Sequence, residues 1–141
     1  MEQEKDKQES HSKAEQPQGL GPAQEMPEGF NALIQELDKL QRRVHDVSVG
    51  MGQWEGEPTE MDLHALMHVD IAKATVAVHQ SLPLYDFSDL EPKGEMVELT
   101  DCVLHILDYF GSLGISFGQV LARKHLHDRR MIDRKRRANN V

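Results

Sequence analysis

The chain has 141 residues and a formal net charge of −8, and 38% of its residues are hydrophobic, although only seven are Phe, Tyr or Trp. This length suits one domain, and a core built from Leu, Val, Ile, Met and Ala favours helices over a β-sandwich. The sequence contains neither an apolar leader nor a run of 18 apolar residues, and its single cysteine, Cys102, excludes an internal disulfide. We therefore expect an all-α, cytoplasmic protein with no membrane partner.

The charge is distributed unevenly along the chain. Residues 1–28 carry three lysines against seven acids, residues 29–121 carry five basic side chains against fifteen acids, and residues 122–141 carry eight against two. An acidic folded region holds cations or repels phosphate, so nucleic acid is not expected as the partner of the middle segment. The basic end is either a phosphate-binding segment or a solvated end of a helix.

The first half of the chain predicts a tail and two helices. Residues 1–28 hold almost no large apolar side chain, which indicates a disordered tail. From Phe30 to Val47 apolar residues recur at helical spacing, and Gly50 is expected to end that helix. Thr59, with Asp62 three residues later, is typical of a capping box that opens a second helix, which Pro83 stops.

The second half predicts two more helices. One runs from about Lys93 to Leu113. Gly114 follows it, at the position where a glycine in the left-handed conformation commonly ends a helix. Ser116 and Gln119 form another capping pair, from which a fourth helix runs into the basic end. The pattern predicts a four-helix bundle over residues 29–131, followed by a basic tail over residues 132–141.

A stripe of acids follows one face of the third predicted helix. Glu98, Asp101, His105 and Asp108 are spaced by three, four and three residues, so they project from the same side. Like charges at that distance repel unless a cation lies between them. The stripe is either the solvated side of the helix or one wall of a metal-binding cleft, and the apolar residues on both flanks favour the cleft.

Asp70 is the only acid between Asp62 and Asp86, within the apolar run "ALMHVDIAKATVAV". A carboxylate in such surroundings needs a partner. Lys73, one turn further along, could supply an ordinary ion pair. The alternative partner is the acidic stripe, across a pair of helices that share a metal ion.

These residues resemble a known family. The segment "VDIAK", followed after a spacer by "GEMVELTDCVLHILDYFGSLGIS" and "ARKHLHDRR", resembles the MazG-like all-α nucleoside triphosphate pyrophosphohydrolases over residues 29–131. Their pattern is E-E-x-x-E, a spacer, E-x-x-D and a later Lys-x-x-x-Asn-x-x-Arg. The resemblance implies a MazG-like bundle that hydrolyses (d)NTP to (d)NMP and pyrophosphate, as a homodimer or homotetramer.

The resemblance also implies roles for individual residues. Glu98 and Asp101, from the E-x-x-D motif, would bind Mg²⁺ or Mn²⁺ and take part in catalysis, and Asp70 would join them from the first motif. Lys124 would contact a substrate phosphate, and Asp128 stands where that motif has Asn.

The first acidic motif departs from the family pattern, because Val69 and Lys73 replace two of its three acids. An ammonium group cannot bind a metal ion. Either Lys73 serves as an extra phosphate contact beside a reduced metal site, or the site has decayed and the domain is a nucleotide-binding or regulatory oligomerisation module.

Two further features each allow two interpretations. Trp54, in a glycine-rich loop, could stack on a nucleobase of the substrate or plug the end of the bundle. His64 and His68 have a spacing that can bind Zn²⁺, but no third ligand stands at a suitable spacing, so ordinary histidines are favoured.

Overall fold

The computed structural model describes residues 26–139, and these residues form four α-helices and no strand. The helices are α1 (Phe30–Gly50), α2 (Glu60–His79), α3 (Glu95–Ser112) and α4 (Phe117–Asn139). The expected all-α class and all four expected helices are confirmed. The tail predicted for residues 1–28 lies almost entirely outside the described residues.

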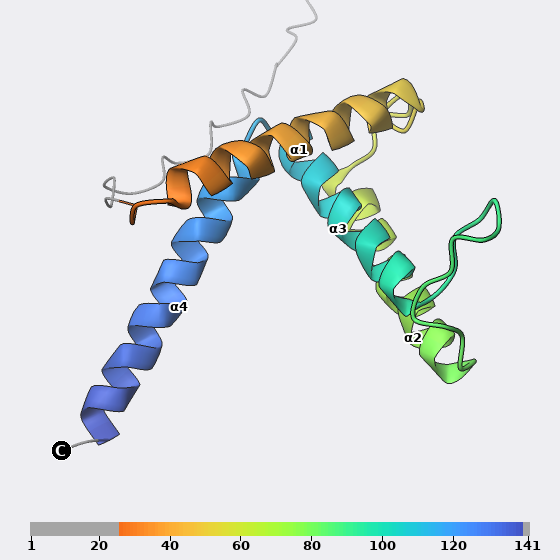
Figure 1. The fold of residues 1–141 in the computed structure, drawn as a ribbon. Coiled ribbons are helices and arrows are strands. Elements are labelled where there is room, and N and C mark those ends of the chain that lie inside the picture. Colours follow the sequence, from red (N-terminus) through yellow and green to blue (C-terminus); the bar gives the residue numbers. More distant parts are fainter. Residues whose placement is uncertain (1–25, 140–141) are drawn as a thin grey trace, which may run out of the picture.

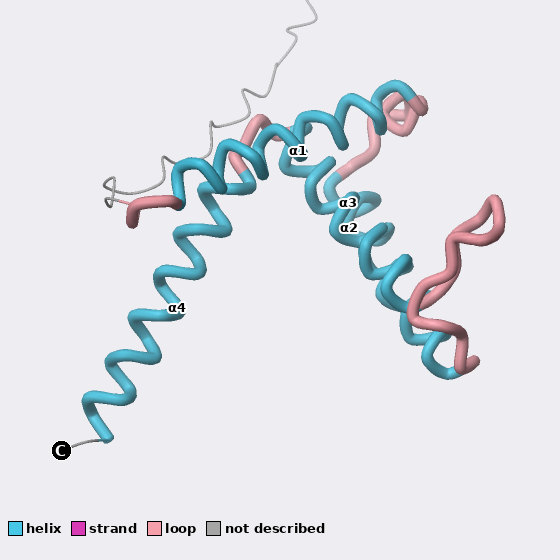
Figure 2. Tube along the Cα trace, in the orientation of Figure 1, coloured by secondary structure: helices cyan, strands magenta, loops and turns pink. Residues whose placement is uncertain are grey.

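The four helices form two arms joined by α1. Helices α2 and α3 pack side by side as a hairpin, while α1 lies across the end of α3 and also packs against the first half of α4. Figure 1 shows α4 leading away from α1 in a different direction from the α2–α3 hairpin, and Figure 2 shows the same two arms as a trace. Within one chain, the described helices therefore make an open arrangement rather than a closed bundle.

Local chemistry explains where the helices begin and end. The Thr59 hydroxyl accepts a hydrogen bond from the Asp62 backbone N–H (3.3 Å), and the Asp62 carboxylate accepts one from the Thr59 N–H (2.9 Å), so the predicted capping box is present. Gly114 has a φ of 65°, the left-handed conformation expected after α3. The Ser116 hydroxyl accepts from the Gln119 N–H (3.0 Å) and opens α4.

Helix α4 extends beyond residue 131, where the helical domain was predicted to end. It continues without interruption past residue 131 to Asn139, so the described part of the predicted basic tail, residues 132–139, is helical. Every residue from His127 to Asn139 is exposed. This half of α4 therefore stands clear of the rest of the described chain.

The core is small and partly open. Its buried apolar side chains are Ile34, Leu63, Ala74, Ala77, Cys102, Leu107 and Ala122. Ten other apolar side chains of these helices and their ends are exposed: Leu33, Leu40, Val47, Leu66, Ile71, Val78, Leu82, Met96, Leu99 and Val103. The reason is the open arrangement, because each helix has neighbours on only part of its apolar surface.

Polar side chains of α1 fix the start of α4. Asp38 accepts hydrogen bonds from the Gly118 backbone N–H (3.0 Å) and the Ser116 hydroxyl (2.7 Å). The buried Gln41 accepts from the Phe117 N–H (2.8 Å) and donates to the Ile115 carbonyl (2.9 Å). These bonds satisfy N–H groups that a helix N-terminus would otherwise leave without partners.

None of the helices in residues 26–139 combines the length and the apolar character that crossing a membrane would require.

Candidate functional site

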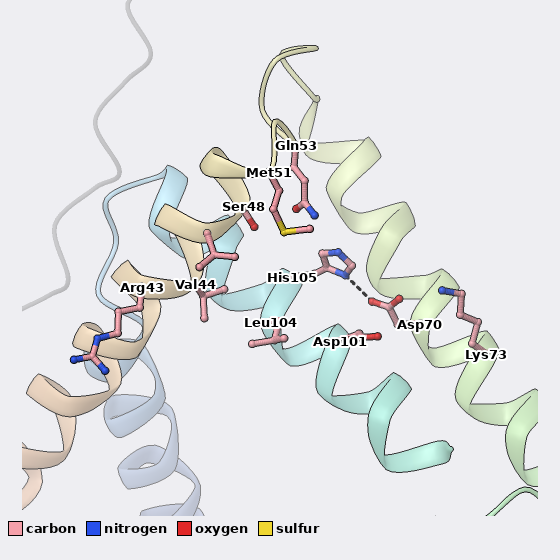
Figure 3. A pocket seen from close by; sticks show the side chains of 11 residues that line it. Arg43, Val44, Ser48, Met51, Gln53, Asp70, Lys73, Asp101, Leu104 and His105 are labelled. Carbon is pink, nitrogen blue, oxygen red and sulfur yellow. Dashed lines mark hydrogen bonds and ion pairs between the residues drawn. The ribbon is translucent and has the colours of Figure 1, made fainter. Parts of the chain in front are cut away.

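A cavity of about 540 Å³ lies where α1, the loop after it, α2 and α3 meet. Its ionisable side chains are Arg43 from α1, Asp70 and Lys73 from α2, and Asp101 and His105 from α3. Figure 3 shows these groups together with the less polar wall, which is formed by Val44, Ser48, Met51, Gln53 and Leu104. Three of the predicted site residues, Asp70, Lys73 and Asp101, therefore line the same cavity.

Asp70 is held by His105. Its side chain is almost completely buried, with 3% of the residue exposed, and its Oδ2 lies 2.6 Å from the His105 Nδ1. Since a carboxylate oxygen accepts hydrogen bonds, the His105 Nδ1–H is the donor in this contact. The partner of Asp70 is therefore His105, which belongs to the acidic stripe, and not Lys73 (Figure 3).

Asp101 lies one turn before His105 and faces the same cavity. Its side chain makes no hydrogen bond or ion pair with any residue in the range 26–139. Its carboxylate oxygens are therefore available to a ligand or to water.

Glu98 has a different environment from Asp101. Its carboxylate lies 3.9 Å from the Lys73 ammonium group, and both residues line a neighbouring groove between α2 and the segment that precedes α3. The Lys73 side chain is 57% exposed, so solvent weakens this attraction. Lys73 lines both the cavity and the groove, which places its positive charge between Asp70 and Glu98.

The donor atoms suit Mg²⁺ in kind, since it prefers carboxylate oxygens and commonly takes only one or two from the protein, with water and phosphate completing the set. Asp101 and the second oxygen of Asp70 meet that requirement. Among residues 26–139, however, no three His, Cys, Asp or Glu side chains are grouped closely enough to hold a metal ion together.

Cys102, which follows Asp101 on α3, is buried. Burial raises the pKa of its thiol, and the negative charge of nearby Asp70 raises that pKa further. A thiol in this environment stays protonated and acts as a small apolar side chain.

Trp54 lies outside the cavity and is held by α3. Its Nε1 lies 3.2 Å from each carboxylate oxygen of Asp108, and its ring meets the edge of His45 with the centroids 5.3 Å apart. The His45 Nδ1 donates to the same Asp108, at 2.6 Å. This geometry agrees with the structural role considered for Trp54, in which it closes one end of the helix pair, and not with stacking in the cavity.

The remaining predicted site residues are not brought to the cavity. Lys124 and Asp128 lie on α4, where the Lys124 ammonium group binds both oxygens of Asp128 at 2.5 and 2.6 Å, and that hydrogen bond and charge lower the pKa of Asp128. His68 donates from Nδ1 to the His64 carbonyl, and the His64 ring contacts the edge of Tyr109. The two histidines thus have ordinary contacts within the chain.

Sequence reasoning left one of these groupings open and missed another. It gave Asp70 two possible partners, Lys73 and the acidic stripe that contains His105, and did not choose between them. The triad of His45, Asp108 and Trp54 joins three separate parts of the chain, and its only signal was Asp108 at the end of the stripe. Periodicity shows which residues share a helix face, but it does not show which face of the next helix they meet.

The chain was also compared with known proteins. No family model, curated protein or solved structure matches it.

Proposed function

We propose that the chain is a Mg²⁺-dependent nucleoside triphosphate pyrophosphohydrolase, which converts (d)NTP and water to (d)NMP and pyrophosphate. The observation that carries this proposal is the cavity in which Asp70 and Asp101, from two facing helices, stand beside the cationic groups of Lys73 and Arg43. Carboxylates beside cations suit a ligand that brings both phosphate and a metal ion. The resemblance of "ELTD" to the E-x-x-D motif supports the same assignment.

Asp101 and Asp70 would hold the metal ion. Glu98, one turn before Asp101 on α3, would be a third carboxylate. The ion, when bound, neutralises phosphate charge and lowers the pKa of bound water. Lys73 and Arg43 add positive charge on the opposite sides of the cavity, where they would bind and orient the triphosphate. The bond from His105 holds Asp70 in place.

The role of Glu98 can be tested through metal affinity. Because Glu98→Gln removes one negative charge while keeping the side chain's size, we expect Mg²⁺ or Mn²⁺ to bind more weakly, on the order of tenfold. Calorimetric titration of the two proteins measures this difference. Glu95→Gln makes the same change three residues earlier on α3 and should leave affinity unchanged; equal affinities in wild type and Glu98→Gln would contradict the assignment of Glu98.

The activity is tested by incubating the purified chain with each NTP and dNTP and Mg²⁺ and measuring released pyrophosphate. Release that depends on Mg²⁺ and falls in Asp101→Asn supports the proposal. If no nucleotide yields pyrophosphate, the chain is not a pyrophosphohydrolase.

A second candidate function is a non-catalytic, nucleotide-binding or regulatory oligomerisation module of the same class. It is favoured by the contact between Lys73 and Glu98, which places an ammonium group where a metal ion would need a carboxylate. Lys73→Glu distinguishes the two. If Lys73 contacts phosphate in an active site, the rate of pyrophosphate release falls, whereas a site that has decayed through loss of this acid gains activity.

We further propose that the chain forms a homodimer or homotetramer. The apolar residues of α2 are spread around the helix, and Leu66, Val69, Ile71, Val76 and Val78 are each between 43% and 56% exposed. A helix that is apolar on all sides is normally buried. Sedimentation equilibrium should therefore give a mass of at least twice 16.0 kDa, and Val69→Lys with Val76→Lys should shift it toward the monomer.

A further inference from the structure

A second cavity, of about 440 Å³, lies between the first half of α1 and the start of α4. We call it the α1–α4 cavity, and it shares no lining residue with the cavity that contains Asp70. It lies beside the point where Gly118 lets α4 approach the backbone of Ile34 on α1. The proposed function uses none of its polar lining residues, which are Asn31, Gln35, Asp38, Gln119 and Arg123.

The sequence places these polar side chains on one face of each helix. Asn31, Gln35 and Asp38 are separated by four and three residues on α1. Gln119 and Arg123 are separated by four residues on α4. Two helices that only pack against each other normally meet through apolar faces. This part of the junction between α1 and α4 therefore suits a polar ligand better than a packed core.

Arg123 is the side chain of this cavity that most needs a partner. It is partly buried, and its Nε is the one fully buried side-chain nitrogen or oxygen among residues 26–139 that has no hydrogen-bond partner. Its guanidinium group forms no hydrogen bond or ion pair with any residue that the structure describes. Burying a charged donor is unfavourable unless an acceptor compensates it. An anion in the cavity would supply the missing negative charge.

Asp38 brings the opposite charge to the same cavity. Its two carboxylate oxygens accept from the Ser116 hydroxyl and the Gly118 N–H, which leaves each oxygen a second lone pair. Asp38 forms no ion pair with Arg123, although both residues line the α1–α4 cavity. A ligand that carries both charges can satisfy the two groups at once, whereas Asp38 would repel inorganic phosphate.

We propose that the α1–α4 cavity binds a free α-amino acid. The terminal nitrogens of Arg123 hold its carboxylate through the parallel pair of hydrogen bonds that arginine forms with carboxylates, and Asp38 accepts from its ammonium group. The side-chain amides of Asn31 and Gln35 both donate and accept, which suits a polar side chain on the ligand. The cavity volume falls within the range of about 300–1,000 Å³ that is usual for small-molecule sites.

The test is isothermal titration calorimetry of the full chain with each standard L-amino acid at millimolar concentration. We expect at least one amino acid with a polar side chain to bind. Two analogues of that amino acid, its carboxamide and its des-amino acid, each lack one of the two charges. Each analogue should bind at least about tenfold more weakly, because it leaves either Arg123 or Asp38 without a charged partner.

Arg123→Gln should weaken binding of the same amino acid by about tenfold or more. The matched control is Arg129→Gln, which makes the same change on α4 outside the cavity and should leave binding unchanged. Circular dichroism at 222 nm checks that both variants keep their helices, and the analogue titrations use the wild-type chain, so they decide the question even if Arg123→Gln does not fold.

Four results would overturn the proposal. They are no binding by any amino acid, binding of inorganic phosphate in place of amino acids, an analogue that binds as tightly as the parent amino acid, and equal weakening by both variants. None of these measurements depends on pyrophosphate release, so they are independent of the proposed function.

Discussion

Asp108→Ala is expected to lower the free energy of unfolding by about 3 kcal/mol, since it removes the shared acceptor of two donors from separate parts of the chain. Asp108 is 3% exposed and accepts from His45 on α1 and from Trp54 in the loop that follows α1. Without it, two ring N–H groups lose their partner in a site that is mostly closed to water. The His45 side chain is 25% exposed, so water can replace part of its lost hydrogen bonding. The expected loss therefore lies at the lower end of the range of about 3–5 kcal/mol for breaking a buried ion pair.

Urea unfolding followed by circular dichroism measures this loss, and Trp54 adds a local probe because it is the only tryptophan of the chain. Its fluorescence emission should move to longer wavelength when its anchor on α3 is removed. Asp101→Ala is the matched control, because Asp101 lies on the same helix and has no partner among residues 26–139. The role given to Asp108 would be wrong if both variants changed stability by less than about 0.5 kcal/mol.

Gly118→Ala is expected to destabilise the contact between α1 and α4 by about 2–3 kcal/mol. Gly118 is buried in the first turn of α4, and a Cβ atom there would lie 2.8 Å from both the Cα and the carbonyl oxygen of Ile34. Those are backbone atoms of α1, which cannot move as a side chain can. The added methyl group therefore pushes the two helices apart and weakens the bonds from Ser116 and Gly118 to Asp38.

Gly50→Ala is the control for this variant. Gly50 is the last residue of α1, and a Cβ atom there would meet nothing within 4 Å. Because alanine favours helices more than glycine does, this change should be neutral or slightly stabilising. Thermal unfolding measures both variants, and hydrogen exchange of the α4 amides shows whether the loss is local. A Gly118→Ala protein as stable as wild type would mean that α4 does not pack on α1 through this glycine.

Most of the secondary structure was predictable because its signals are local. The Thr59–Asp62 capping box, Gly114 in the left-handed conformation and the Ser116 cap were each visible within a few residues of sequence. The start of α3 was predicted two residues early, at Lys93 and not at Glu95. There the backbone of Lys93 is paired with that of Asp86 in an isolated bridge, a contact between residues seven apart that helical spacing does not reveal.

The candidate site was predictable only in part. Spacing alone placed Asp101 and His105 on one face of α3, and composition marked Asp70 as a carboxylate that needs a partner. The sequence could not choose between Lys73 and the acidic stripe as that partner. In the structure Asp70 is hydrogen-bonded to His105, and Lys73 lies beside Glu98. The sequence allowed either Lys73 or His105 as the partner of Asp70. The rotation of α2 relative to α3 decided between them.

By itself, the sequence determined the helices, their caps and the faces on which acids and apolar residues gather, because these depend on residues within a turn or two of each other. Only the tertiary structure decided which faces meet. It placed Asp70, Lys73 and Asp101 around one cavity, joined Asp108 to His45 and Trp54, and directed α4 away from the α2–α3 hairpin. The physical reason is that the angle and rotation between packed helices depend on contacts between residues far apart in the chain, such as Gly118 against Ile34.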